Sequence, residues 1–310
     1  MIPIACYLPK KIVTNDDFKS IYDDWDSDRV YEQTGIKSRH YVEDNEISSD
    51  LAKKAIDKLI NEYNIDKNSI DMLICVTETP DNMLPSTACK LQHICELPAT
   101  CAAFDMNHGC AGFTYGIMAA KSFILSGMFS NIIVVTVDTL SRFTPVENRG
   151  IKVLIGDAAS ASFISKDNIH NIGDFIYGTD GSGYDDIIIK HDNNIPALCM
   201  EGVNVFSFAI NNCPDMINNI LEQNNTVIDN IDHVILHQAN KTILEYIKKR
   251  LKLPADKFYI NMEETGNTAG STIPIAIKYL EEHKKLEKGQ NILVLGFGVG
   301  LSHCGTIIKW

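Results

Sequence analysis

The stretch NHGCAGF, residues 107–113, lies where a strand-like apolar run gives way to a helical pattern. It places the thiol of Cys110 at the start of the expected helix, where the helix dipole stabilises negative charge and lowers the pKa of a thiol. A cysteine considered alone would more often be a buried, unreactive side chain. The turn between strand and helix favours the other interpretation, and we predict that Cys110 is a nucleophile.

Two further turns of the same kind are HQAN, residues 237–240, and GNTAGS, residues 266–271. Considered alone, His237 could be a hydrogen-bonded core histidine, and Asn267 could cap the helix that follows it. An imidazole and a carboxamide that face a thiol could instead donate hydrogen bonds to an oxyanion, which suits acyl transfer through a thioester. The three turns therefore predict a catalytic set of Cys110, His237 and Asn267, in which Asn267 could serve both purposes.

These turns are related by a weak internal repeat with an offset of 160 residues. ICVT at 74–77 aligns with VILH at 234–237, and IIVV at 132–135 aligns with ILVL at 292–295, so that position 107 falls on position 267. Each half then alternates strands with helices, which is typical of layered α/β folds. Ligands of such folds lie beyond the carboxyl ends of strands, so halves packed about a pseudo-twofold axis would bring the three turns to one cleft.

Hydrophobic periodicity predicts the elements of both halves. In the first half we expect strands at 71–77, 101–105, 132–138 and 159–165 and helices at 86–95 and 110–126. In the second half we expect strands at 233–237, 258–261, 292–295 and 303–309 and helices at 239–251 and 269–283. The predicted halves are residues 1–170, with Cys110, and 171–310, with His237 and Asn267. A loop at 178–186 joins them, and residues 23–46 are expected to form an irregular, charged insertion.

Composition narrows the classes of function. The 310 residues are 45% hydrophobic and 22% charged, as in a globular protein with a large core. A net charge of −12 argues against nucleic acid as the main partner, and no apolar run approaches the roughly 20 residues of a membrane span. Nine cysteines without a C-x-x-C pattern predict neither a disulfide framework nor a metal site. No signal peptide is recognisable, so the cytoplasm is the expected location.

Taken in order, the motifs resemble those of the β-ketoacyl-acyl carrier protein synthase III family of thiolase-like condensing enzymes. They are QTGIKSRH (33–40), PSTAC (85–89), CAGF (110–113), NRG (148–150), GDAA (156–159), HQAN (237–240), GNT (266–268) and GFGVG (296–300). The resemblance covers nearly the whole chain. It implies an α/β fold, the duplicated five-layer α-β-α-β-α thiolase architecture, usually assembled as a homodimer.

The resemblance also implies a mechanism. Cys110 would carry the acyl group, while His237 and Asn267 would bind the thioester oxygen of malonyl-acyl carrier protein as carbon dioxide leaves. The resulting carbanion would attack the acyl group, whose oxygen would rest in a hole made by the backbone N–H groups of Cys110 and Val299. No tightly bound cofactor is implied, because acyl-coenzyme A or acyl-carrier protein is the substrate. The implied acyl pocket contains Leu84, Met200, Phe206 and Phe297.

Several substrate-contact positions depart from the family pattern. Arg29 and Gln33 stand where relatives usually have a tryptophan and an arginine that grip the adenine of coenzyme A, although Arg149, at another nucleotide-contacting position, is retained. An arginine that contacts the carrier protein is replaced by threonine at position 242. The basic run at 248–252 nevertheless keeps Lys249 and Arg250 as predicted carrier contacts. We expect an altered grip on coenzyme A.

Other departures lie close to the predicted acyl site. Gly109 precedes the cysteine where many relatives have alanine, Val299 stands where they often have glycine, and Leu84 replaces an aromatic residue that caps the pocket across the dimer. These changes predict a specialised member of the family.

Two other functions stay open. The same fold could transfer the acyl group from Cys110 to an alcohol or amine without decarboxylation, or the chain could be a non-catalytic partner subunit of another synthase. Partner subunits of that kind typically lack the nucleophile, which is present here. Degradative thiolases use a second cysteine near the C-terminus, where this chain has Cys304, but the place of Cys304 in an expected strand favours a structural role.

Overall fold

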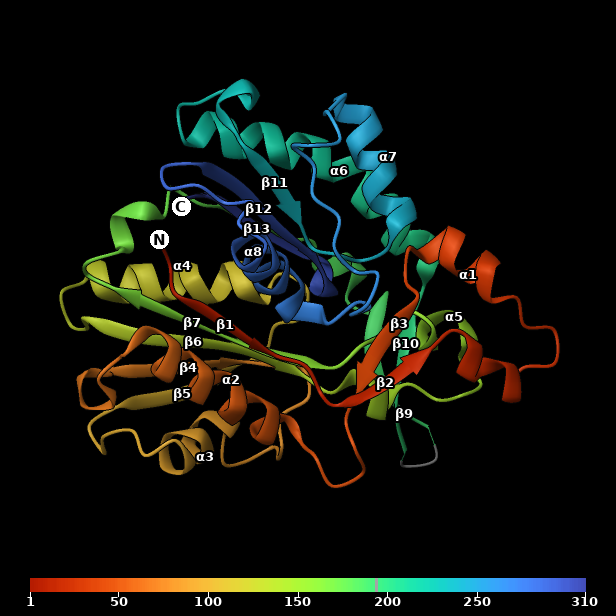
Figure 1. The fold of residues 1–310 in the computed structure, drawn as a ribbon, viewed down its shortest axis with the longest axis horizontal. Helices are drawn as coiled ribbons and strands as arrows, with labels where there is room; N and C mark the ends of the chain where they lie inside the picture. Colours follow the sequence, from red (N-terminus) through yellow and green to blue (C-terminus); the bar gives the residue numbers. More distant parts are fainter. Residues whose placement is uncertain (193–194) are drawn as a thin grey trace.

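The chain folds into two β-sheets that share a layer of helices between them (Figure 1). This computed structural model describes residues 1–192 and 195–310. The strand order is β1-β7-β6-β4-β5 in the first sheet and β11-β12-β13-β8 in the second. The strands are β1 (Ile4–Tyr7), β4 (Met72–Val76), β5 (Ala102–Met106), β6 (Asn131–Asp138), β7 (Ala158–Ser165), β8 (Ile176–Thr179), β11 (His233–Leu236), β12 (Asn291–Gly298) and β13 (Ser302–Lys309).

The two sheets follow one pattern, as the internal repeat predicts. In each, a parallel pair (β4–β6 or β11–β12) is extended by two antiparallel pairings, through β7 to β1 or through β13 to β8. The central strands β6 and β12 begin at Asn131 and Asn291, and their apolar runs are buried on both faces. Continuous β-branched and leucine-rich runs form strands of this kind because both faces of the sheet are covered by helices.

The helices form three layers around the sheets. α2 (Ser48–Tyr63) and α3 (Thr87–Ile94) cover the first sheet, while α6 (Gly202–Gln223) and α7 (Lys241–Leu251) lie on the far side of the second (Figure 1). The shared layer consists of α4 (Gly112–Leu125) and α8 (Thr272–Glu282), which contact both sheets. Both are largely apolar, and side chains such as Phe113 and Ile273 belong to one buried cluster between the sheets. The order of layers is α-β-α-β-α, as predicted.

The second sheet has one strand fewer than the first. The strand expected at 258–261 is absent, because Phe258 makes only an isolated bridge to Val234. The backbone N–H of Asn261 instead donates to the side-chain oxygen of Gln238 at 2.7 Å. A side chain therefore satisfies a backbone group that a strand ladder would otherwise pair.

Three other segments also differ from the prediction. Residues 23–46 are not irregular throughout, because they include α1 (Ser27–Thr34), capped by the Asp26 carboxylate, and β3 (Ser38–Tyr41). The loop expected at 178–186 begins inside β8 and contains a 3₁₀ turn. The helix expected from residue 269 starts as a 3₁₀ turn over Ala269–Ser271 before α8 begins.

The remaining elements border the sheets. They are β2 (Lys11–Thr14), which pairs with β3, the pair β9 (Ile187–Asp192) and β10 (Ile195–Met200), and the short helix α5 (Arg149–Lys152). Within the described ranges, no helix is both long enough and apolar enough to cross a membrane. The boundary between the halves at residue 170 stays a prediction.

Candidate active site

A cavity of about 240 Å³ contains all three predicted catalytic side chains, Cys110, His237 and Asn267. Cys110 lies in the turn between β5 and α4, His237 follows β11 directly, and Asn267 precedes the 3₁₀ turn that leads into α8. The predicted convergence of the three turns is therefore observed. Apolar side chains form most of the wall, namely Leu140, Ile151, Leu154, Ile155, Ile187, Leu198, Met200, Val205, Phe206, Ile243 and Phe297.

The Cys110 thiol packs against the glycine turn at the end of β12. A Cβ on Gly298 would lie 2.8 Å from Cys110 Sγ, and a Cβ on Gly296 would lie 2.6 Å from the Cα of Ala111. Side chains at either position would push the nucleophile away, so the turn requires glycine. The backbone N–H groups of Val299 and of Cys110 itself lie close enough to the sulfur to lower the pKa of the thiol. The two N–H groups expected to form the oxyanion hole thus lie at the nucleophile.

The thiol is not activated in the way that the helix start predicts. Burial raises the pKa of Cys110, the Glu78 carboxyl raises it further, and the two backbone N–H groups offset this only in part. The expectation of a lowered pKa is wrong because α4 begins two residues later, at Gly112, and the sulfur is removed from water. In the resting protein Cys110 is a thiol, and its reaction needs a proton acceptor.

His237 is a neutral imidazole held in a fixed orientation. Its Nδ1 lies 2.9 Å from Thr272 Oγ1, and its ring meets the Phe297 ring edge to face at 5.6 Å between centroids. Burial lowers the pKa of His237 to about 3, so the ring carries no charge at neutral pH. A neutral ring with one nitrogen bound to Thr272 can offer the other nitrogen to a substrate oxygen.

Asn267 both caps a turn and faces the cavity. Its Oδ1 accepts a hydrogen bond from the backbone N–H of Ala269 at 3.0 Å. Its own backbone N–H donates to Leu154 O at 2.7 Å, and its carbonyl accepts from the N–H of Gly156 at 2.9 Å. Because Oδ1 has a backbone partner, the amide NH₂ remains for the cavity. The capping and catalytic interpretations of Asn267 are compatible.

The predicted acyl-pocket residues divide into two groups. Met200, Phe206 and Phe297 line the cavity with Val299. Leu84 does not, because it lies on the loop before α3 and its side chain is 83% exposed. Its predicted place over the pocket of a second chain stays a prediction.

Arg149 does not line the cavity in this structure. Its guanidinium pairs with Asp24 at 2.8 Å and lies over the rings of Tyr22 and Trp25, at 5.3 and 4.8 Å from their centroids. The contact with a nucleotide stays a prediction. Arg29 and Gln33 are exposed on α1, where the carbonyl of Gln33 accepts a hydrogen bond from Thr242 on α7 at 2.7 Å.

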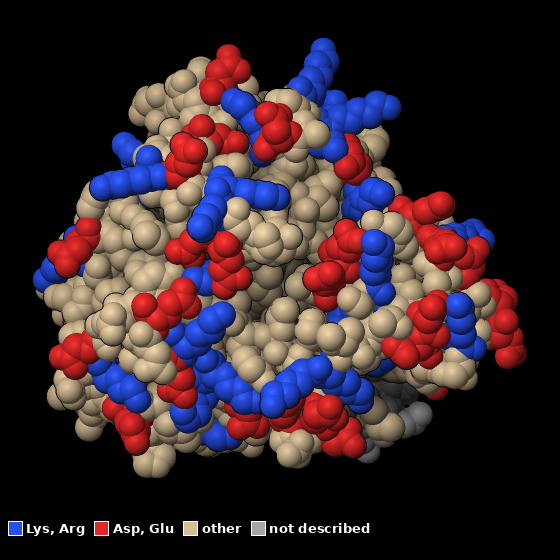
Figure 2. Space-filling model, viewed as in Figure 1, with Lys and Arg blue, Asp and Glu red and all other residues tan. Residues whose placement is uncertain are grey.

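The α7 helix connects the cavity with a basic surface. Its capping residue Asn240 lines the cavity, while four lysines along the helix and just after it line a surface hollow of about 770 Å³, together with Glu32 and Glu245. Figure 2 shows Lys and Arg side chains projecting over this part of the molecule. The exposed Lys249 lines the hollow, whereas Arg250 donates to the carbonyl of Ile210 on α6 at 3.0 Å.

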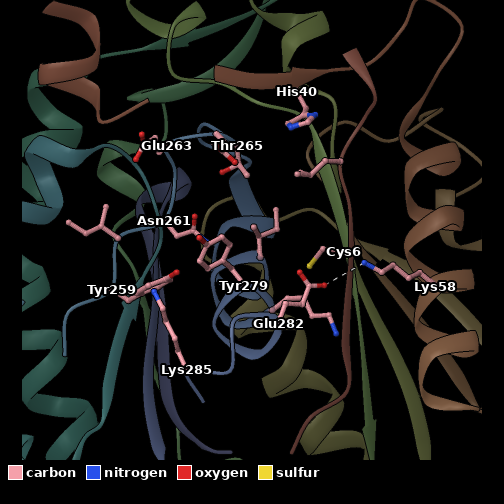
Figure 3. Close-up of a pocket in the computed structure, with 15 residues that line it drawn as sticks. Cys6, His40, Lys58, Tyr259, Asn261, Glu263, Thr265, Tyr279, Glu282 and Lys285 are labelled. Atoms are coloured by element: carbon pink, nitrogen blue, oxygen red, sulfur yellow. Dashed lines mark ion pairs between the residues drawn. The ribbon is translucent and has the colours of Figure 1, made fainter. Parts of the chain in front are cut away.

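A larger, polar pocket of about 610 Å³ lies elsewhere, between α2, α8 and the segment 259–265 that follows α7 (Figure 3). Lys58 and Glu282 form an ion pair at 3.8 Å at its edge. The thiol that it contains, Cys6, has its pKa raised to about 12 by burial. None of the predicted catalytic residues lines this pocket, and its thiol is unsuited to nucleophilic attack.

Cys304 is likewise not part of the cavity. It is fully buried in β13, and burial raises the pKa of its thiol to about 12. Its expected structural role agrees with this position. Among the described residues, no group of three or more His, Cys, Asp or Glu side chains is arranged to hold a metal ion.

Besides Asn240 of the HQAN motif, the cavity contains a polar residue that sequence reasoning missed, Glu78. It follows β4 after Thr77, and burial raises the pKa of its carboxyl to about 7. An acidic residue directly after a buried strand was the available signal, because the cavity lies beyond strand ends.

Comparisons with known proteins identify one family. The model described as 3-oxoacyl-[acyl-carrier-protein (ACP)] synthase III matches residues 104–181, and the model of its C-terminal part matches residues 221–310. The β-ketoacyl-[acyl-carrier-protein] synthase III of Clostridium novyi (strain NT) is 36% identical over 316 residues, which cover 98% of this chain and 96% of that protein.

Solved structures agree. One of a 3-oxoacyl-(acyl-carrier-protein) synthase III superposes with a TM-score of 0.95 at 32% identity and covers 100% of this chain and 99% of its own. That of the Aquifex aeolicus VF5 synthase III gives a TM-score of 0.92 at 30% identity, covering 100% and 99%.

Proposed function

Since this chain belongs to the β-ketoacyl-[acyl-carrier-protein] synthase III family, we propose that it is a condensing enzyme that joins an acyl group on Cys110 to malonyl-acyl carrier protein, with loss of carbon dioxide. The observation that carries this proposal is the meeting of Cys110, His237 and Asn267 in one largely apolar cavity. Thiol, imidazole and carboxamide in that arrangement match a thioester nucleophile facing donors for an enolate oxygen.

The first half-reaction loads the acyl group. The Cys110 sulfur attacks the thioester carbon, and the negative charge that develops on oxygen is received by the N–H groups of Cys110 and Val299. Both groups are fixed in the backbone of tight turns, so they need no reorganisation as the charge forms. The acyl chain extends along Met200, Phe206 and Phe297.

In the second half-reaction, His237 and Asn267 act as hydrogen-bond donors. Thr272 Oγ1 lies 2.9 Å from His237 Nδ1 and 3.1 Å from the carbonyl oxygen of Ala269, and its single proton can go to either. When the hydroxyl donates to Nδ1, the neutral His237 presents Nε2–H to the thioester oxygen of the malonyl group, beside the amide NH₂ of Asn267. As carbon dioxide leaves, the electrons of the broken bond move into the enolate, whose oxygen these donors stabilise. The enolate carbon then attacks the acyl carbon, and the Cys110 sulfur leaves.

The partner that delivers the malonyl group is an acyl carrier protein. The start of α7 lies at the cavity and its other end bears Lys248, Lys249 and Lys252, a basic surface that would attract an acidic carrier. Acyl-coenzyme A or acyl-carrier protein would load Cys110, and no bound cofactor takes part. A reducing compartment such as the cytoplasm would keep the thiol of Cys110 free.

Two copies of the chain would form a homodimer through β5. This strand lies at the edge of the first sheet and is only partly buried along its whole length, with the sequence AAFDM. On the nearby loop, Met83 and Leu84 are 100% and 83% exposed. An apolar, unpaired strand edge next to exposed apolar side chains is the kind of surface that a second chain covers.

The test is the release of carbon dioxide from malonyl-acyl carrier protein, together with the mass of the product. We expect His237→Ala and Asn267→Ala to lose decarboxylation by about 100-fold or more while Cys110 still takes up an acyl group. Cys110→Ser should lose acyl transfer. Unchanged decarboxylation in both the histidine and asparagine variants would rule out this mechanism, and an ester or amide product without carbon–carbon bond formation would favour the acyltransferase alternative.

A further inference from the structure

The cavity holds a carboxyl group that the condensation mechanism above does not use. Glu78 lies one residue beyond Thr77 at the end of β4, and its side chain lines the cavity together with Cys110. Among residues 1–192 and 195–310, no group donates a hydrogen bond to this carboxyl, although its backbone N–H donates to Asp138 at 2.8 Å. The side chain is half-buried, and a carboxylate with a purely structural role in so apolar a cavity would ordinarily have a hydrogen-bond partner.

The position of the carboxyl depends on a glycine. A Cβ on Gly109, the residue before the nucleophile, would lie 2.1 Å from Glu78 Oε1 and 2.4 Å from Oε2. The carboxyl of Glu78 thus occupies the space that any side chain at position 109 would need. It lies against the peptide that carries the Cys110 thiol.

The surrounding charges set the proton affinity of Glu78. Asp138, at the end of β6, is fully buried and accepts from the Glu78 N–H and from the hydroxyls of Thr77 and Thr79. Burial and the nearby Glu78 raise the pKa of Asp138 well above its ordinary value, while that of Glu78 rises to about 7. Cys110 shares the cavity with Glu78 and is a thiol, and His237, which lines the same cavity, is neutral.

A proton acceptor with such an affinity is what Cys110 lacks. The thiol is protonated in the resting protein, and His237, whose pKa is lowered to about 3, is a poor base for it. A base whose pKa lies near the working pH accepts a proton most efficiently in the transition state. Glu78 has that property, and its carboxyl lies against Gly109, the residue before the nucleophile.

We propose that Glu78 is a further catalytic residue, the general base that accepts the Cys110 thiol proton during acyl loading. The inference rests on the proposed acylation of Cys110. As the sulfur attacks the thioester carbon, its proton moves to the Glu78 carboxylate and a C–S bond to Cys110 forms. The C–S bond to the donor thiol then breaks, and the proton passes to the departing thiolate. Acyl-Cys110 and a free thiol result, and Glu78 is a carboxylate again.

The test compares the native chain with Glu78→Gln, which has nearly the same shape. Acetyl-coenzyme A is the probe, and the mass of the intact protein follows the acylation of Cys110 with time. We expect acylation of the variant at pH 7.5 to be about 100-fold slower, the size of a typical general-base contribution. Glu222→Gln, an exposed change on α6, should load Cys110 at the native rate.

The sign of the change in acylation rate distinguishes a general base from a carboxylate that only repels the thiolate. A carboxylate that only repels the thiolate would be removed by E78Q, which would lower the pKa of Cys110 and make acylation as fast as in the native chain or faster. That result would overturn the proposal.

A second variant displaces the carboxyl and leaves it in the protein. Gly109→Ala puts a Cβ where Glu78 Oε1 now lies, so the flexible side chain must move. We expect G109A to slow acylation as E78Q does, and the double variant E78Q/G109A to be little slower than either single variant, because both changes remove one interaction. Native-rate loading in G109A, or losses that multiply in the double variant, would contradict the proposed geometry.

Alkylation of Cys110 with iodoacetamide at several pH values distinguishes failure of this inference from failure of the proposed function. With Glu78 as the base, the native rate rises through the neutral range and the rise moves to higher pH in E78Q. If Glu78 only repels the thiolate, the rise moves to lower pH in E78Q. A native chain that accepts no acyl group from any thioester would refute the proposed function, and the alkylation profile would still decide the role of Glu78.

Discussion

Asn267 shows how one side chain can serve the fold and the chemistry with different atoms. Its Oδ1 accepts from the N–H of Ala269 at the start of the 3₁₀ turn, and its NH₂ group is free for the cavity. A single substitution can therefore separate the two tasks, provided that it keeps an oxygen and removes the amide.

We predict that Asn267→Asp retains the cap and loses the donor. Its stability in urea unfolding should stay close to native, whereas Asn267→Ala should lose about 1 kcal/mol, as for an ordinary helix cap. Both variants should lose decarboxylation of malonyl-acyl carrier protein by about 100-fold or more. Decarboxylation retained by the aspartate variant would mean that the amide is not the donor.

From the burial of the His237 imidazole we predict how the free energy of unfolding depends on pH. Burial lowers the pKa of His237 from 6.5 to about 3, so the unfolded chain binds a proton there at a pH where the folded chain does not. Stability is therefore lost as pH falls below 6.5, and the loss continues until pH 3. Between pH 7 and pH 5 the native chain should lose about 2 kcal/mol more than His237→Gln. Urea unfolding of both proteins at the two pH values measures this, and equal losses would show that the ring is not kept neutral.

Residue roles were predictable from sequence only where a local pattern carries them. Cys110 and His237 each follow a strand, and Asn267 falls on position 107 in the repeat, so the repeat alone brings the three turns together. The raised pKa of Cys110 was not predictable, because it depends on burial by the glycine turn almost 190 residues later in the chain, at Gly298. The position of Glu78 after β4 was a signal for its place in the cavity, but its close approach to the residue before the nucleophile was not predictable, since it depends on the space left at Gly109.

Among the elements, the strands and helices with long apolar patterns were predicted most accurately. β6 and β12 lie within one residue of their expected starts, because each is buried on both faces. The strand expected at 258–261 was wrong because the Gln238 side chain took the place of the ladder partner. A hydrogen bond between a side chain and a distant backbone group produces no periodic pattern in the sequence, so it could not be predicted.

The α7 helix carries a prediction about the carrier protein. Reversing the charge of its exposed lysine, Lys249→Glu, should raise the KM for malonyl-acyl carrier protein several-fold and leave kcat nearly unchanged. The basic helix attracts the acidic carrier protein but takes no part in the chemical steps. Raising the salt concentration should reduce the difference in KM between the variant and the native chain, because salt screens the charges. Lys166→Glu, an exposed lysine after β7, is the matched control. Equal KM values for both variants would show that carrier protein docks elsewhere.

At the scale of the whole molecule, the repeat leaves one sheet edge unmatched. The second sheet ends at β11, beside which Phe258 makes only a single parallel bridge where the first sheet has the full strand β5. Its backbone faces β4 on one side only. Ala102 donates to Asp71 on that side, so the N–H of the next residue, Ala103, points to the free edge.

We predict that the native chain sediments as a dimer of 34.5 kDa subunits and that Ala103→Pro shifts it toward the monomer. Proline removes the outward N–H that a second β5 would use, yet it is tolerated on an edge strand because no bond within the chain is lost. Sedimentation velocity at several concentrations measures the change, and urea unfolding checks that the monomer stays folded. Ala99→Pro, in the exposed loop before β5, would control for the effect of an added proline. A native chain that remains a monomer at every concentration would refute the proposed interface.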